Sequence, residues 1–141
     1  TRDHALADIN ADYLSRVKAR AAPPLGACRF LVNPTAAKTG ANDNLLIPLK
    51  PADTQTAQRL EAARQSLMTL TRLQRPEYTN FQFHISLAYL CDTLDAAEQT
   101  AYRTAVRGWL TQLAAAGPIT VPRFHFCTFD DMYAFRTLHE V

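Results

Sequence analysis

Three segments of the chain place apolar residues at spacings of three and four, the period of a helix with one buried face. The second is expected to end near Gln74, because Pro76 disfavours helical backbone just before it. The third opens with Asp95 and has Glu98 three residues later, the spacing of a capping box. The sequence therefore predicts amphipathic helices over residues 3–20, 53–74 and 95–116.

Short apolar and β-branched runs between these segments are typical of strands. They are Cys28–Val32, Leu45–Leu49, Phe81–Leu90 and Ile119–Phe129, with a further run near Tyr133–Leu138. The polar stretch 33–44 indicates a long, mobile loop, and Pro48 favours an edge position or a strand end because proline has no backbone donor. The order of elements predicts an α+β fold, a mainly antiparallel sheet of about four strands with helices packed against it.

Composition bounds the class of protein. The chain has 141 residues with a formal net charge of +2, enough for one compact domain and too balanced to demand a nucleic-acid partner. No stretch approaches the roughly 20 apolar residues of a membrane span, and the sequence opens without a signal-peptide pattern. The three cysteines are widely spaced, which fits reduced thiols. We expect a protein of the cytoplasm.

The segment FQFHISLAYL, residues 81–90, alternates apolar and polar positions. Successive strand side chains point to opposite faces, so His84 and Ser86 share one face, about 7 Å apart, opposite an apolar face. An imidazole can exchange a proton with an attacking or bridging oxygen of a phosphodiester, and a hydroxyl can donate to a non-bridging oxygen. His84 and Ser86 are therefore the candidate catalytic pair; a polar face that simply meets solvent is the alternative.

Other side chains could bind substrate at the rim of such a site. A cation attracts phosphate and an aromatic ring stacks on a base; the candidates are Tyr78, Arg123, His125 and Tyr89, although simple alternation puts Tyr89 on the apolar side. A metal site from His125, Cys127, Asp130 and Asp131 is disfavoured, because no second His or Cys lies at ligand spacing. The order Lys38-Thr39-Gly40 is the reverse of a P-loop. We expect neither metal nor cofactor.

The residues around this strand resemble a known family. YTNFQFHISLAYL at 78–90 is followed by FCTFDDMYAF at 126–135, and LKPAD at 49–53 leads into a helix. Together these strings resemble a DUF1868-type member of the 2H phosphoesterase superfamily. The resemblance implies two pseudo-symmetric α+β lobes, each supplying one H-x-[ST] motif to a shared cleft. It also implies metal-independent opening of 2′,3′-cyclic phosphates or related phosphodiesters of RNA ends and nucleotides.

His84 and Ser86 match one of the two motifs, and no second H-x-S or H-x-T occurs in the sequence. We therefore expect residues 1–141 to be a single C-terminal lobe, with helix 1–20 as the junction to a missing upstream lobe. A second copy of the chain could complete the site instead. The isolated chain is expected to be nearly inactive. The remaining alternatives are a catalytically inert nucleotide- or RNA-binding module and a structural interaction domain.

Overall fold

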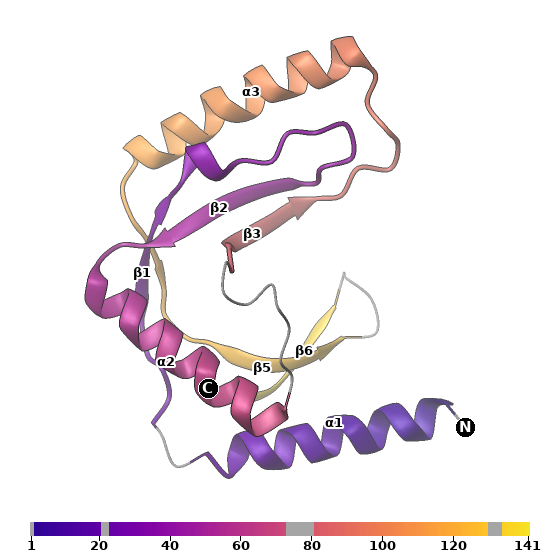
Figure 1. Cartoon of the computed structure of the whole chain (residues 1–141), viewed down its shortest axis with the longest axis vertical. Helices are drawn as coiled ribbons and strands as arrows, with labels where there is room; N and C mark the ends of the chain where they lie inside the picture. Colours follow the sequence, from indigo (N-terminus) through magenta and orange to yellow (C-terminus); the bar gives the residue numbers. More distant parts are fainter. Residues whose placement is uncertain (1, 21–22, 73–80, 130–133) are drawn as a thin grey trace. The chain divides into compact units, whose positions relative to one another are not determined.

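The computed structural model describes residues 2–20, 23–72, 81–129 and 134–141, with side chains from residue 7 onward (Figure 1). The chain divides into two compact units. The first unit contains Thr1–Cys28, Thr54–Tyr78 and Val121–Val141, and the second contains Arg29–Asp53 and Thr79–Thr120. Each unit thus draws on segments that are far apart in the sequence.

All three predicted helices form, as α1 (Arg2–Lys18), α2 (Thr54–Thr71) and α3 (Ala96–Ala115). The capping box of α3 is confirmed: the Asp95 carboxylate accepts from the Glu98 backbone amide at 2.9 Å, and the Glu98 carboxylate accepts from the Asp95 amide at 2.9 Å. Helix α2 ends at Thr71, before the end near Gln74 that Pro76 predicted. Arg72 follows directly and has a left-handed φ of 57°, a backbone conformation that ends helices. No helix among the described residues is long and apolar enough to cross a membrane.

The strands of the described residues form two sheets. A four-stranded sheet has the order β3-β2-β1-β4, in which β1 with β2 and β2 with β3 pair antiparallel. Strands β5 and β6 make an antiparallel pair. The bounds are β1 Cys28–Val32, β2 Leu45–Pro51, β3 Phe83–Ala88, β4 Ile119–Val121, β5 His125–Phe129 and β6 Phe135–Glu140. The predicted α+β fold with a mainly antiparallel sheet is confirmed.

The prediction of one strand over Ile119–Phe129 is wrong. Pro122 cannot donate to a ladder, and it lies directly after β4. Strand β4 belongs to the four-stranded sheet, whereas β5 pairs with β6. Aromatic and β-branched residues occur on both sides of Pro122, so the proline was the local sign of the change of sheet.

Pro48 lies inside β2, which is flanked by β1 and β3, so the prediction of an edge or terminal position is wrong. The Pro48 carbonyl accepts from the amide of Asn33 at 2.8 Å. This bond lies just beyond Val32 and Leu49, the last pair of residues in the β1–β2 register. A strand residue directs its nitrogen and carbonyl to the same side. The proline nitrogen therefore points toward β1, at the position where the pairing of β1 with β2 ends. The hydrogen bonds between β2 and β3 consequently need no donor from Pro48.

The loop 33–44 is more structured than its composition indicates. It contains a short 3₁₀ helix, η1 (Pro34–Ala36), and its carbonyl and amide groups bond to residues that follow β3. The Leu94 amide donates to the Ala41 carbonyl at 3.0 Å, and the Thr93 hydroxyl lies 2.7 Å from the Asn42 side-chain oxygen. Asx side chains satisfy nearby backbone and hydroxyl groups in this way, so the loop is fixed by polar contacts rather than by apolar packing.

One face of the sheet carries the core of the second unit. The pairs Val32–Leu49 and Leu49–Phe83 place these side chains on the same face, and the rings of Phe30 and Phe83 are 5.4 Å apart on it. Phe30 is only 2% exposed. The other buried hydrophobic residues of this unit include Ile47, Val106 and Leu110, the last two from α3.

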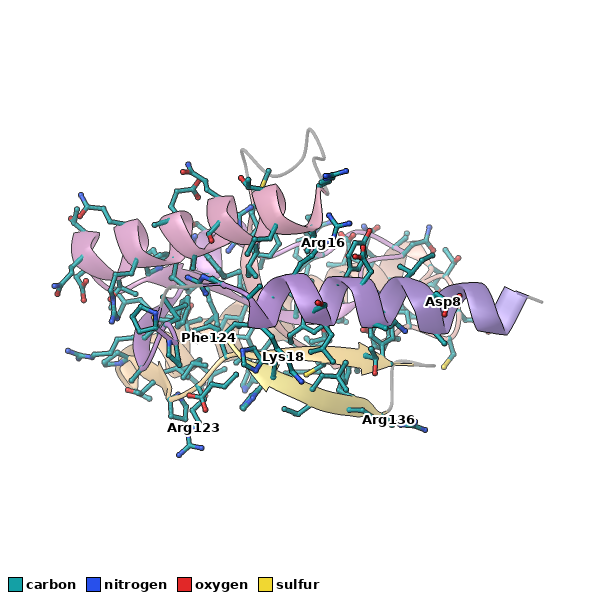
Figure 2. All side chains as sticks on the ribbon, turned by 90° about the horizontal axis from the view of Figure 1, so that it is seen from below. Asp8, Arg16, Lys18, Arg123, Phe124 and Arg136 are labelled. Atoms are coloured by element: carbon teal, nitrogen blue, oxygen red, sulfur yellow. The ribbon has the colours of Figure 1, made fainter. Side chains whose placement is uncertain are left out.

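In the first unit, α1 contacts both α2 and β6. The Arg16 guanidinium donates to the Leu70 carbonyl of α2 at 3.3 Å and pairs with Asp12 at 2.8 Å. Figure 2 shows Arg16 on the side of α1 nearer α2, and Lys18 on the side nearer the β5–β6 pair. The last turn of α1 therefore presents cations in two directions.

Candidate functional site

His84 and Ser86 lie on β3, at one edge of the four-stranded sheet. Their register partners on β2 are Pro48 and Leu46, two positions apart, so both side chains share one face. Both residues are exposed. On the opposite face Phe83 and Ile85 are half-buried, consistent with the predicted alternation. The geometry therefore presents an imidazole and a hydroxyl together on an accessible surface.

The His84 ring is oriented by the backbone of its own segment. Its Nδ1 atom lies 3.0 Å from the Gln82 carbonyl oxygen. A carbonyl oxygen can only accept, so Nδ1 carries the proton in this contact. The neutral imidazole then has an unprotonated Nε2, because the partner of one ring nitrogen fixes the tautomer of the other. Nε2 is the atom that can take a proton from a bound water or hydroxyl.

Gln82 holds this arrangement in place, a role that the sequence did not reveal. Its side-chain amide donates to the Leu49 carbonyl at 2.6 Å and to the Phe83 carbonyl at 3.0 Å. These bonds tie the start of β3 to β2, directly beside the carbonyl that contacts His84. The signal that could have identified Gln82 is its place two residues before the imidazole, on the same face of an alternating strand.

A β-bulge lies at the Ser86 end of the strand. Leu46 pairs with Ser86 but Leu45 pairs with Ala88, so β3 has one extra residue at Leu87. The extra residue shifts the alternation by one position. Tyr89, which simple alternation assigns to the apolar face, follows the last residue of β3 and is 48% exposed. The placement of Tyr89 on the core side was therefore wrong.

Strand β3 ends the order of the four-stranded sheet, and no other strand of the described residues pairs with its outer side. Pro48 directs its carbonyl to the β1 side, so the Pro48–His84 pair is of the non-hydrogen-bonded kind. The amide and carbonyl of His84 consequently point away from β2, toward the open edge. The strand carries no charged side chain, and Phe81 and Leu87 are 44% and 48% exposed beside it. Such an uncharged edge is a template for another strand.

The other predicted site residues lie in different parts of the chain. Arg123 and His125 are exposed residues of the first unit, whereas His84, Ser86 and Tyr89 belong to the second. Tyr78 lies outside the described residues. The site assembled within one unit therefore consists of His84, Ser86, Tyr89 and the positioning residue Gln82.

Ligands for a metal are not gathered anywhere in the described part of the chain: it has no group of three or more His, Cys, Asp or Glu residues that could hold an ion. Asp130 and Asp131, which the disfavoured metal hypothesis would use, lie outside the described residues. Cys28, Cys91 and Cys127 form no disulfide with one another in the described part of the chain. The chemistry that the site offers is that of an imidazole and a hydroxyl.

Comparisons with known proteins bear on the fold. No protein-family model matches the chain, and no curated protein matches it. The chain is similar to the crystal structure of ATU0111, a conserved protein of unknown function from Agrobacterium tumefaciens. The TM-score is 0.65 at 20% identity, and the match covers 96% of this chain but 53% of the other. The likeness shows the fold alone. The chain spans about half the length of that protein.

Proposed function

We propose that this chain supplies one half of the active site of a metal-independent phosphodiesterase that opens 2′,3′-cyclic phosphates or related phosphodiesters of nucleotides and RNA ends. The observation that carries the proposal is the exposed His84–Ser86 pair, with Nδ1 of His84 held by a carbonyl and Nε2 left to exchange a proton. The resemblance of the flanking strings to the 2H phosphoesterase superfamily supports the same reaction.

Opening a cyclic phosphate needs two proton transfers. Water loses a proton as its oxygen bonds to phosphorus, and the departing ribose oxygen gains a proton as its bond to phosphorus breaks. His84 Nε2 performs one of these transfers. The Ser86 hydroxyl donates a hydrogen bond to a non-bridging oxygen, where negative charge grows in the transition state. A second imidazole must perform the other transfer, and the chain offers no second H-x-[ST] motif for it.

The second motif comes from an upstream lobe of a longer protein. The chain matches only 53% of the ATU0111 chain, which leaves room for a further lobe in a protein of that length. The uncharged open edge of β3 suits an added strand next to His84. A second copy that brings its own His84–Ser86 pair is the other way to complete the site. The three widely spaced cysteines fit action in the reducing cytoplasm.

A catalytically inert nucleotide- or RNA-binding module is the second candidate function. It is favoured by Tyr89, which follows the bulge of β3, is 48% exposed and could stack on a base. A hollow of about 230 Å³ lined by Asn42 and residues 90–93 adjoins the end of this segment. Such a module would bind the same nucleotides without turning them over.

Binding at the His84 face is testable in the chain as it stands. On titration with a nucleoside 3′-monophosphate, we expect the ring-proton NMR signals of His84 to shift saturably at millimolar concentration, because a phosphate bound on this face changes the surroundings of the imidazole while it accepts from Ser86. Ser86→Ala should weaken the apparent affinity by about tenfold, the worth of one hydrogen bond to a charged group.

Ser15→Ala is the matched control, since Ser15 is an exposed serine on α1 in the other unit. It should leave the titration unchanged. Signals of His84 that stay fixed throughout, or an equal effect of the two serine variants, would contradict a phosphate site on this face.

A further inference from the structure

The face of the four-stranded sheet that carries His84 also carries two cations. Strands β1 to β4 contain Arg29 and Lys50 and no aspartate or glutamate. Lys50 lies two residues after Pro48, the register partner of His84, so its side chain is on the His84 face. Lys50 pairs in turn with Leu31 of β1, and Arg29 lies two residues before Leu31. Both cations therefore share the face of the proposed active site.

His84, Lys50 and Arg29 form a diagonal line across the neighbouring strands β3, β2 and β1. Lys50 is the diagonal neighbour of His84. Arg29 is the diagonal neighbour of Lys50 in the same direction, since its carbonyl accepts from the amide of Ala52, two residues after Lys50. Diagonal neighbours of an antiparallel pair are about 7–8 Å apart. This step is comparable with the separation of successive phosphates along a nucleotide chain.

Both cationic side chains are available to a ligand. Lys50 and Arg29 are exposed, and neither makes an ion pair or a side-chain hydrogen bond among the described residues. On α1, by contrast, Arg16 has a carboxylate partner in Asp12 at 2.8 Å. The two cations belong to the same compact unit as His84. An anion that reaches them therefore displaces water and breaks no contact within the protein.

The positions of these cations separate them from the reacting phosphate. Ser86 pairs with Leu46, which is four residues from Lys50, or about 13 Å along β2. In the proposed mechanism the reacting phosphate contacts the His84 ring and the Ser86 hydroxyl. Lys50 lies on the other side of the imidazole from Ser86. It is therefore placed to meet a different anionic group of the same substrate.

We propose, on the basis of the proposed function, that Lys50 and Arg29 bind the two phosphates that precede the reacting phosphate in an RNA chain. The substrate is then an RNA end rather than a free mononucleotide. Ammonium and guanidinium groups donate charge-assisted hydrogen bonds to phosphate oxygens. Contacts with phosphates carry no information about base identity, so these cations position the chain and accept any sequence.

The number of phosphates on the ligand tests this assignment in the 141-residue chain. The ligands are a nucleoside 3′-monophosphate, a nucleoside 3′,5′-bisphosphate and a 5′-phosphorylated dinucleotide with a 3′-phosphate, and the ring-proton signals of His84 report binding. At low salt we expect the affinity to rise roughly tenfold with each added phosphate, the worth of one charge-assisted contact. Lys50→Met should remove the gain from the second phosphate and leave the affinity of the monophosphate unchanged, whereas Lys50→Arg should keep the gain. Arg29→Met should remove only the gain from the third phosphate.

Lys38→Met is the matched control, because it removes the same charge from an exposed lysine of the same unit. It should leave all three affinities unchanged. Equal affinities of the three ligands, or equal effects of Lys38→Met and Lys50→Met, would overturn the assignment of the cations while leaving the phosphate site at His84 intact. A gain with the bisphosphate but no further gain with the dinucleotide would overturn the assignment to an RNA chain. His84 signals that respond to none of the ligands would overturn the proposed function, and the role of these cations with it.

Discussion

Replacing His84 with alanine is expected to lower the kcat of the completed phosphodiesterase by about 10²- to 10⁴-fold, the usual worth of one general acid–base group. In the proposed mechanism the loss follows because Nε2, the ring atom not engaged in the contact with the Gln82 carbonyl, carries the proton in this half of the site. Affinity for a nucleotide product should change far less, since the imidazole acts mainly in the transition state. Steady-state kinetics on a 2′,3′-cyclic nucleotide measures both quantities.

Ser15→Ala in the other unit should retain full activity in the same assay. A His84→Ala variant that keeps its kcat would contradict the assignment of His84 as an acid–base group. Loss of affinity with unchanged turnover would also contradict it, and would indicate a binding face instead.

The largest expected effect on stability comes from Phe30→Ala. Phe30 is 2% exposed on β1, and its ring lies 5.4 Å from that of Phe83 on the edge strand that carries His84. Removing it leaves a cavity in the sheet core, so the free energy of unfolding should fall by about 3–5 kcal/mol. The shift of the urea midpoint at constant slope measures this change.

Phe129→Ala is the matched control. Phe129 is 56% exposed, and its ring packs against that of Phe135 in the β5–β6 pair. It should cost about 1 kcal/mol or less, the worth of an aromatic pair near the surface. Equal losses in the two variants would mean that Phe30 is not at the centre of the core.

The helices were predictable because their signals are local. The capping box of Asp95 and Glu98 fixes one helix start by bonds between residues three apart, and no distant contact is needed to form it. The end of α2 was missed by contrast. Arg72 adopts a left-handed conformation that its residue type does not announce, whereas the sequence drew attention to Pro76.

The strands were harder to predict because a sheet depends on partners from elsewhere in the chain. Nothing near Pro48 indicates that pairing with β1 ends opposite it, and this ending is what allows a proline in an internal strand. In the same way, the apolar run across Pro122 belongs to two different sheets. Local composition cannot distinguish one partner strand from another.

The prediction of the candidate site likewise succeeded where it depended on local signals and failed where it depended on strand pairing. Alternation correctly placed His84 and Ser86 on one exposed face, since that depends only on the period of a strand. The bulge at Leu87 breaks the alternation before Tyr89, which is 48% exposed, and bulges arise from the pairing register rather than from residue type. The contact between the Gln82 carbonyl and His84 likewise depends on the backbone and ring conformation, which the residue types do not specify.

The measurement that tests the proposed half-site most directly is hydrolysis of a 2′,3′-cyclic nucleotide in excess chelator. It compares the 141-residue chain alone with the same chain joined to, or mixed with, a lobe that carries the second H-x-[ST] motif of the proposal. We expect negligible turnover by the chain alone and metal-independent turnover when the second H-x-[ST] motif is supplied, abolished again by His84→Ala. Full turnover by the monomeric chain alone in chelator would contradict the half-site, and would require a second acid–base group within these residues.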